Sequence, residues 1–138
     1  MRRLFASRVF FYAGMYGLLA VAPMYFLEAR FGVDNPPAIT HPEFFYGFVG
    51  VALACQVLFL ILSQDPARYR PMMIPAVLEK LTFGVAVLIL LAGGRVSGPI
   101  VGFALIDLLL GALFAWSYVK NSAGEMNSGK RSLKRPTH

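Results

Sequence analysis

The sequence contains few charged residues. Asp, Glu, Lys and Arg together make up 14% of its 138 residues, whereas 57% are hydrophobic, and the mean hydropathy is +0.62. A soluble domain carries about 25% charged residues. This deficit indicates that lipid rather than water surrounds much of the chain, and it argues against a soluble domain.

Cysteine is nearly absent. The one cysteine, Cys55, lies within an apolar run. A single cysteine forms no intrachain disulfide, and it excludes a CxxC redox pair and a zinc site built from cysteines. We interpret Cys55 as a small buried hydrophobic residue. We also expect no cofactor, no metal and no catalytic residue, because the sequence has no cofactor fingerprint, nucleophile arrangement or metal-ligand spacing.

Acidic residues are outnumbered by basic ones, 7 against 13, which gives a net charge of +6. An excess of this kind could indicate nucleic-acid binding. Most of the basic residues, however, stand at the chain ends and between apolar stretches, which is how membrane topology is encoded. We therefore expect a lipid bilayer as partner and no nucleic acid.

Four apolar runs are long enough to cross a bilayer core, which requires about 20 residues. The start of the third run is open between Met72 and Ala76, because Pro71 and Pro75 both fit a helix start. The predicted fold is all-α, a four-transmembrane-helix bundle in up-down-up-down order within residues 1–119. The expected spans cover residues of about 9–27, 44–62, 72–92 and 100–119.

Helix-boundary signals flank these spans. Thr40 and Glu43 have the spacing of a capping box before the second span. Ser97 with Pro99 could start the fourth span in a similar way. The connection over residues 28–41 contains the run NPP, so we expect turns there and no further helix.

The first span has an alternative interpretation. A basic N-terminus, an apolar run and the triplet Ala20-Val21-Ala22 resemble a secretory signal peptide. The apolar run continues to Leu27, however, and Pro23 would directly follow the cut. We therefore expect an uncleaved span in which Pro23 kinks the far end of the helix.

The basic residues predict an orientation. Three lie in the N-terminal tail (Arg2, Arg3 and Arg8), two between the second and third spans and five in the C-terminal tail, against two in the other connections. The positive-inside rule then places both termini in the cytoplasm. Residues 120–138 form a basic tail that we expect to be disordered. This tail could contact anionic lipid, or it could serve only to anchor the topology.

The polar residues inside the spans form the candidate site. Asp107 lies near the middle of the fourth span, where an aspartate costs about 2.5–3.5 kcal/mol on insertion scales. Glu79 and Lys80 are adjacent in the third span, and Gln56 and Tyr16 fall at a similar depth. We therefore predict one inward-facing cluster of these five residues.

Two roles for this cluster are open. It could bind a ligand or a proton, which is the default hypothesis for intramembrane carboxylates. Alternatively, Lys80 pairs with a carboxylate while Gln56 and Tyr16 fill the remaining hydrogen bonds and fix the helix register. Thr82 could join from the next position around the third helix.

Three segments carry a family resemblance: FVGVALACQVLFL in the second span, the short connection YRPMM, and DLLLGALF in the last span. With the length and the four spans, they make the chain similar to small bacterial four-helix membrane proteins of the DoxX-like kind. The resemblance implies an inner-membrane location and, as in some members, service as an accessory subunit of a redox enzyme. It implies no catalytic residue.

Three functions follow as hypotheses. The first is a non-enzymatic accessory or interaction subunit that acts with another membrane protein or as a homo-oligomer. The second is a carrier or binder of a small lipophilic or protonatable molecule that uses Asp107, Glu79 and Lys80. The third is an intramembrane lipid-modifying enzyme with Asp107 or Glu79 as general acid or base.

Overall fold

The chain forms an all-helical membrane protein. A computed structural model describes residues 2–96 and 98–132, with side chains described for residues 3–96 and 98–121. Within these residues there are helices and no strand. The helices are α1 (Arg2–Val21), α2 (Glu28–Asp34), α3 (Pro42–Gln64), α4 (Met73–Ala92) and α5 (Pro99–Ser132), with short 3-10 turns η1 (Ala22–Phe26) and η2 (Arg70–Met72).

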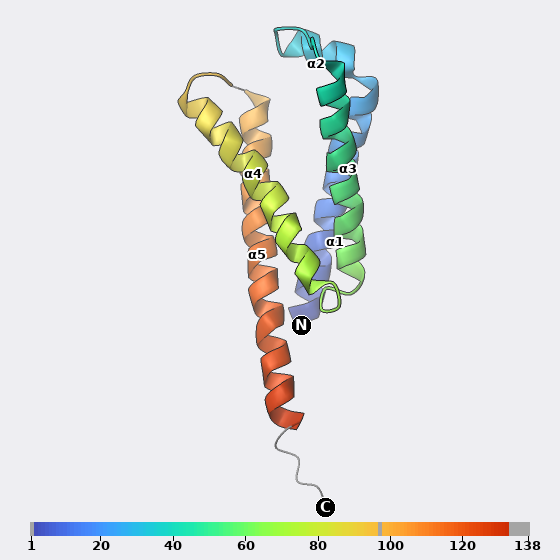
Figure 1. Cartoon of the computed structure of the whole chain (residues 1–138), viewed down its shortest axis with the longest axis vertical. Coiled ribbons are helices and arrows are strands. Elements are labelled where there is room, and N and C mark those ends of the chain that lie inside the picture. The colour runs from blue at the N-terminus through green and yellow to red at the C-terminus, as the bar shows by residue number, and fades with distance from the viewer. Residues whose placement is uncertain (1, 97, 133–138) are drawn as a thin grey trace, which may run out of the picture.

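Four segments are long and apolar enough to cross a membrane, which confirms the prediction of four transmembrane helices. They comprise Arg3–Phe26, Pro42–Gln64, Arg70–Ala92 and Pro99–Asn121. Successive spans run in opposite directions, so the N-terminus and the C-terminal part of α5 lie toward the same end of the molecule (Figure 1). We refer to this end as the terminal end and to the opposite one as the α2 end. The fold is therefore the predicted up-down-up-down four-helix bundle of a multi-pass membrane protein.

The bundle consists of two helical hairpins. The most extensive contacts are those between α4 and α5 and between α1 and α3, whereas α1–α5 and α3–α4 contacts are fewer. The two pairs are close together toward the terminal end and diverge toward the α2 end (Figure 1).

An aromatic core joins the hairpins. Phe10 of α1 stacks on Phe114 of α5 with ring centroids 4.3 Å apart, and Phe59 of α3 lies 5.0 Å from Phe114. All three rings are fully buried, and Met73 and Ala76 of α4 pack in the same cluster. Aromatic pairs at such separations contribute about 0.5–1.5 kcal/mol beyond their burial. All four spans therefore meet in one core.

Glycines allow the close approach within each hairpin. A Cβ at Gly17 of α1 would overlap the Gln56 side chain of α3, and one at Gly84 of α4 would lie 2.6 Å from Leu108 of α5. Small residues let helices in lipid pack backbone to backbone. The spacing of the two hairpins therefore depends on these positions.

Three helix boundaries differ from the predictions or refine them. The capping box was wrong, because α3 begins with His41 as its N-cap and no side-chain cap bond forms. The proline that follows His41 disfavours helical backbone there. α4 begins at Met73, the earlier of the two expected starts. α1 stops at Val21, and Pro23 lies in the 3-10 turn that follows, because proline cannot supply the helical N–H.

The connection to α3 contains a helix that we did not expect. α2 is held by an ion pair of 3.4 Å between Arg30 and Asp34, one turn apart. Tyr46 of α3 also donates a hydrogen bond of 2.8 Å to Glu28. These contacts stabilise a turn of helix that the neighbouring prolines alone argue against.

At the other end of the chain, α5 continues past Val119 to Ser132. Its apolar part ends at Asn121, close to the expected end of the fourth span. Disorder was expected over residues 120–138, but residues 120–132 continue the helix. Ser97, expected at the start of this span, and residues 133–138 lie outside the described residues.

Candidate functional site

Three charged side chains meet between α4 and α5. The Lys80 ammonium lies 3.0 Å from Asp107 Oδ1 and 3.2 Å from Glu79 Oε2, and it donates a hydrogen bond of 3.4 Å to Glu79 Oε1. The side chains of Lys80, Asp107 and Glu79 are 6%, 14% and 23% exposed. We call these three residues the Lys80 triad.

The close packing of α4 and α5 turns Lys80 inward. Gly111 lies one turn beyond Asp107 on α5, and a Cβ there would come within 3.3 Å of Lys80 Cβ. The ammonium also lies 5.4 Å from the ring centroid of Phe59 on α3, an attractive geometry for a cation over an aromatic face. Lys80 therefore pairs inside the bundle and does not extend to the membrane surface.

Gln56 and Tyr16 lie near the triad without bonding to it. The Gln56 amide donates to its own-helix carbonyl at Ala52, 2.9 Å away. Its Oε1 and the Tyr16 hydroxyl are buried and have no hydrogen-bond partner among the described residues. The structure thus brings the predicted residues into one region but links only three of them directly.

The expectation that Gln56 and Tyr16 complete the hydrogen bonds of the triad was therefore wrong. A glutamine inside a helix can satisfy its amide on the preceding turn, and Gln56 does so. Thr82 does not join either, because it is exposed and its hydroxyl donates to Leu78 and Glu79 carbonyls. Such bonding to the preceding turn is usual for threonine in helices.

The triad is unbalanced in charge. Two carboxylates face one ammonium, so full ionisation leaves a formal charge of −1 at a depth where charge is costly. No group of three or more His, Cys, Asp or Glu side chains in the described part of the chain is placed to hold a metal ion. A role of the five predicted residues in binding a ligand or a proton stays a prediction.

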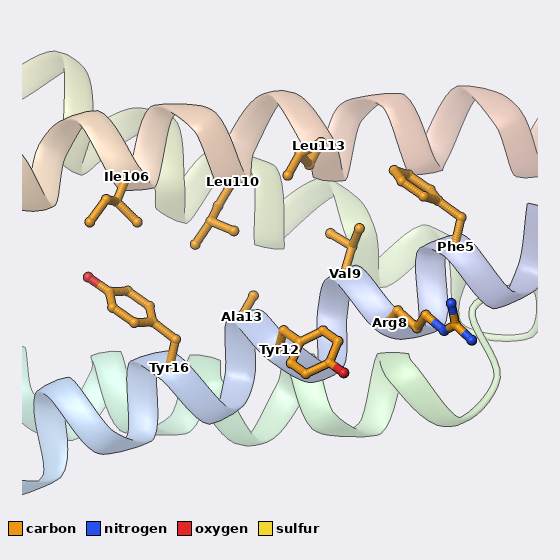
Figure 2. Close-up of a pocket in the computed structure, with 9 residues that line it drawn as sticks. All are labelled: Phe5, Arg8, Val9, Tyr12, Ala13, Tyr16, Ile106, Leu110 and Leu113. Atoms are coloured by element: carbon orange, nitrogen blue, oxygen red, sulfur yellow. The ribbon is translucent and has the colours of Figure 1, made fainter.

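A groove of about 420 Å³ lies between α1 and α5 (Figure 2). From α5, its wall is formed by Ile106, Leu110 and Leu113. From α1, it is formed by Phe5, Arg8, Val9, Tyr12, Ala13 and Tyr16. Tyr16 is at one end of the groove and points toward α5, whereas Phe5 and Arg8 lie at the other end (Figure 2).

Sequence reasoning missed this groove. Arg8, which we had counted only as a topology charge, shares a helical face with Tyr12 and Tyr16 at intervals of four residues. That spacing was the available signal. Asp107 is not part of the groove wall, although its neighbour Ile106 is.

Basic and aromatic side chains gather at the terminal end of α5. The Arg70 guanidinium lies 4.2 Å from the ring centroid of Tyr118, and the Lys120 ammonium lies 4.7 Å from that of Trp116. Tryptophan, tyrosine and basic residues are enriched where a span meets the membrane surface. We therefore interpret these four residues as an interfacial belt at the membrane surface.

In comparisons with known proteins, the chain matches no family model, no curated protein sequence and no solved structure. The DoxX-like resemblance therefore stays a prediction.

Proposed function

We propose that the protein is a non-enzymatic accessory or interaction subunit of the inner (plasma) membrane, with both termini in the cytoplasm. The orientation is supported by the cations of the terminal end. Arg3 and Arg8 stand at the start of α1, Arg68 and Arg70 in the connection to α4, and Lys120 near the end of the apolar part of α5. Positive charge marks the cytoplasmic side of membrane proteins.

One observation carries the non-enzymatic role: the Lys80 ammonium contacts both carboxylates of the triad. An intramembrane acid or base that acts on a substrate needs an atom that faces the substrate. Here Asp107 instead faces Lys80 across the helix interface. The Asp107 carboxylate, the group whose burial in the membrane costs the most free energy, thus joins α4 to α5. This arrangement fits a bundle that functions by binding another protein.

Photo-crosslinking in the membrane tests this function. A photoreactive amino acid is introduced at Val51, Ile89 or Leu109, which present exposed apolar side chains on α3, α4 and α5. A discrete protein adduct from one face, with a second copy or another membrane protein, is the expected result. The fully buried Phe59 serves as the matched control position. Adducts to lipid alone from every face would overturn the proposal.

A second function, binding or carrying a protonatable molecule, is favoured by a different observation. The Tyr16 hydroxyl and Gln56 Oε1 are buried without partners beside a triad that has one more carboxylate than ammonium groups. The carboxylates of such a triad can accept and pass a proton, and the two unpaired polar groups can hydrogen-bond a guest molecule. In proteoliposomes with an internal pH dye, this function requires a proton flux above that of empty liposomes. The Asp107→Asn variant should lose this flux. Flux equal to that of empty liposomes would exclude proton carriage.

A further inference from the structure

The groove between α1 and α5 has an apolar wall and a charged end. Val9, Ala13, Leu110 and Leu113 contribute aliphatic side chains along its length. From Arg8 to Tyr16 the helix rises about 12 Å. Lipid tails are as apolar as such a wall, so the wall accepts a chain without selecting it. Selection must come from the charged end.

Two cations stand at that end. Arg8 lines the groove and makes no hydrogen bond or ion pair within the part of the chain that the structure describes. The Lys120 ammonium of α5 lies 5.8 Å from the ring centroid of Phe5, which lines the same end one turn before Arg8. Helices from both hairpins therefore bring positive charge to one mouth of the groove.

The height of this mouth fits a lipid headgroup. Trp116 and Lys120 mark the end of the apolar part of α5, and Arg8 lies in the first turns of α1. Basic pockets between spans at a membrane surface bind lipid phosphates, and arginine offers a fork of donors that matches phosphate oxygens. The mouth is thus complementary to an anionic headgroup whose chain enters the groove.

We propose that this groove binds one anionic phospholipid of the surrounding bilayer, with its phosphate between Arg8 and Lys120. One acyl chain lies along the wall toward Tyr16. The site is separate from the Lys80 triad and does not depend on the accessory function.

Fluorescence of Trp116, the chain's one tryptophan, reports on this site. Its side chain is exposed, and Lys120 lies over its ring. The protein is reconstituted into phosphatidylcholine vesicles that contain increasing fractions of chain-brominated phosphatidylglycerol or, separately, chain-brominated phosphatidylcholine. Bromine quenches tryptophan at short range, so the two curves give the relative affinity for the anionic lipid next to α5.

We expect the wild-type protein to prefer the anionic lipid. Each cation near the surface contributes about 1 kcal/mol of lipid attraction, so Arg8→Gln should reduce the preference about fivefold. Arg8→Lys should retain most of it. The matched control is Arg3→Gln, which removes an exposed charge from the same helix without touching the groove.

Two results would overturn the proposal. One is equal quenching by the two lipids in the wild-type protein. The other is an equal loss in Arg3→Gln and Arg8→Gln, since this would indicate attraction by surface charge alone. If Arg8→Gln does not fold, Lys120→Gln carries the test, because Lys120 is exposed and an unchanged preference in that variant would equally contradict the site.

Discussion

The ammonium of Lys80 and the carboxylate of Asp107 lie 3.0 Å apart across the interface of α4 and α5. The pair joins two spans that are adjacent in the sequence, and Glu79 contacts the same ammonium from the preceding position. Which charged groups are left unpaired therefore depends on which member of the triad is substituted, so the arrangement can be tested by mutation.

Lys80→Met should destabilise the protein more than Asp107→Asn. The first change leaves two carboxylates without a cationic partner, whereas the second leaves the Glu79–Lys80 contact in place. Breaking a buried pair costs about 3–5 kcal/mol in soluble proteins, but polar contacts between spans average about 0.6 kcal/mol. We expect about 1–2 kcal/mol for Asp107→Asn and more for Lys80→Met, measured by unfolding in mixed micelles. Asp34→Asn, which removes an exposed pair, is the control, and the opposite order would contradict this arrangement.

Glycine-to-alanine substitutions should separate packed positions from open ones. At Gly84 a Cβ would lie 2.6 Å from Leu108, whereas at Gly47 and Gly102 nothing lies within 4 Å. Overpacking costs about 1–3 kcal/mol, so Gly84→Ala should lower the melting temperature. The two open positions should tolerate alanine or gain up to about 1 kcal/mol from its helix propensity. Equal effects at all three positions would argue against the described α4–α5 interface.

Phe114→Ala should be among the most destabilising single changes. Its ring is fully buried and contacts both Phe10 and Phe59. Truncating a buried phenylalanine costs about 3–5 kcal/mol, the cavity included. Leu109→Ala on the same helix should cost little, because Leu109 is exposed. Thermal unfolding in one detergent gives both values, and a small effect of Phe114→Ala would contradict an aromatic core.

Cysteine labelling should report the orientation. In a Cys55→Ala background, which removes the one native thiol, a membrane-impermeant maleimide should label Val33→Cys in intact cells. Val33 is exposed in α2, at the end opposite the termini. Arg68→Cys, between α3 and α4, should react only after the membrane is opened. The reverse pattern would place the termini outside the cytoplasm.

The sequence predicted the spans because crossing a bilayer requires a long uncharged run, and it predicted the triad because charge in such a run needs a partner. It did not predict how the remaining hydrogen bonds are distributed. The Gln56 amide donates a hydrogen bond to a carbonyl of its own helix. The depth of a residue in the membrane, estimated from its position in the span, does not reveal such a bond. The helix α2 is stabilised in part by the hydrogen bond that Tyr46 of α3 donates to Glu28, a contact between two segments that no local sequence pattern indicates.

The sequence did not predict the groove between α1 and α5 for a related reason. It is a space between the first and last spans, and no pattern within either span indicates how closely they approach. Arg8 was visible as a charge, but its position at the mouth of a groove depends on the placement of α5. Features shared by distant spans therefore required the three-dimensional arrangement.

The divergence of the two hairpins also has a consequence for the bilayer itself. Because α1–α3 and α4–α5 are close together at the terminal end and separate toward the α2 end (Figure 1), the molecule is wedge-shaped along the membrane normal. A wedge displaces more lipid from one leaflet than from the other. We therefore expect each copy to occupy unequal areas in the two leaflets, so that its insertion energy depends on local curvature.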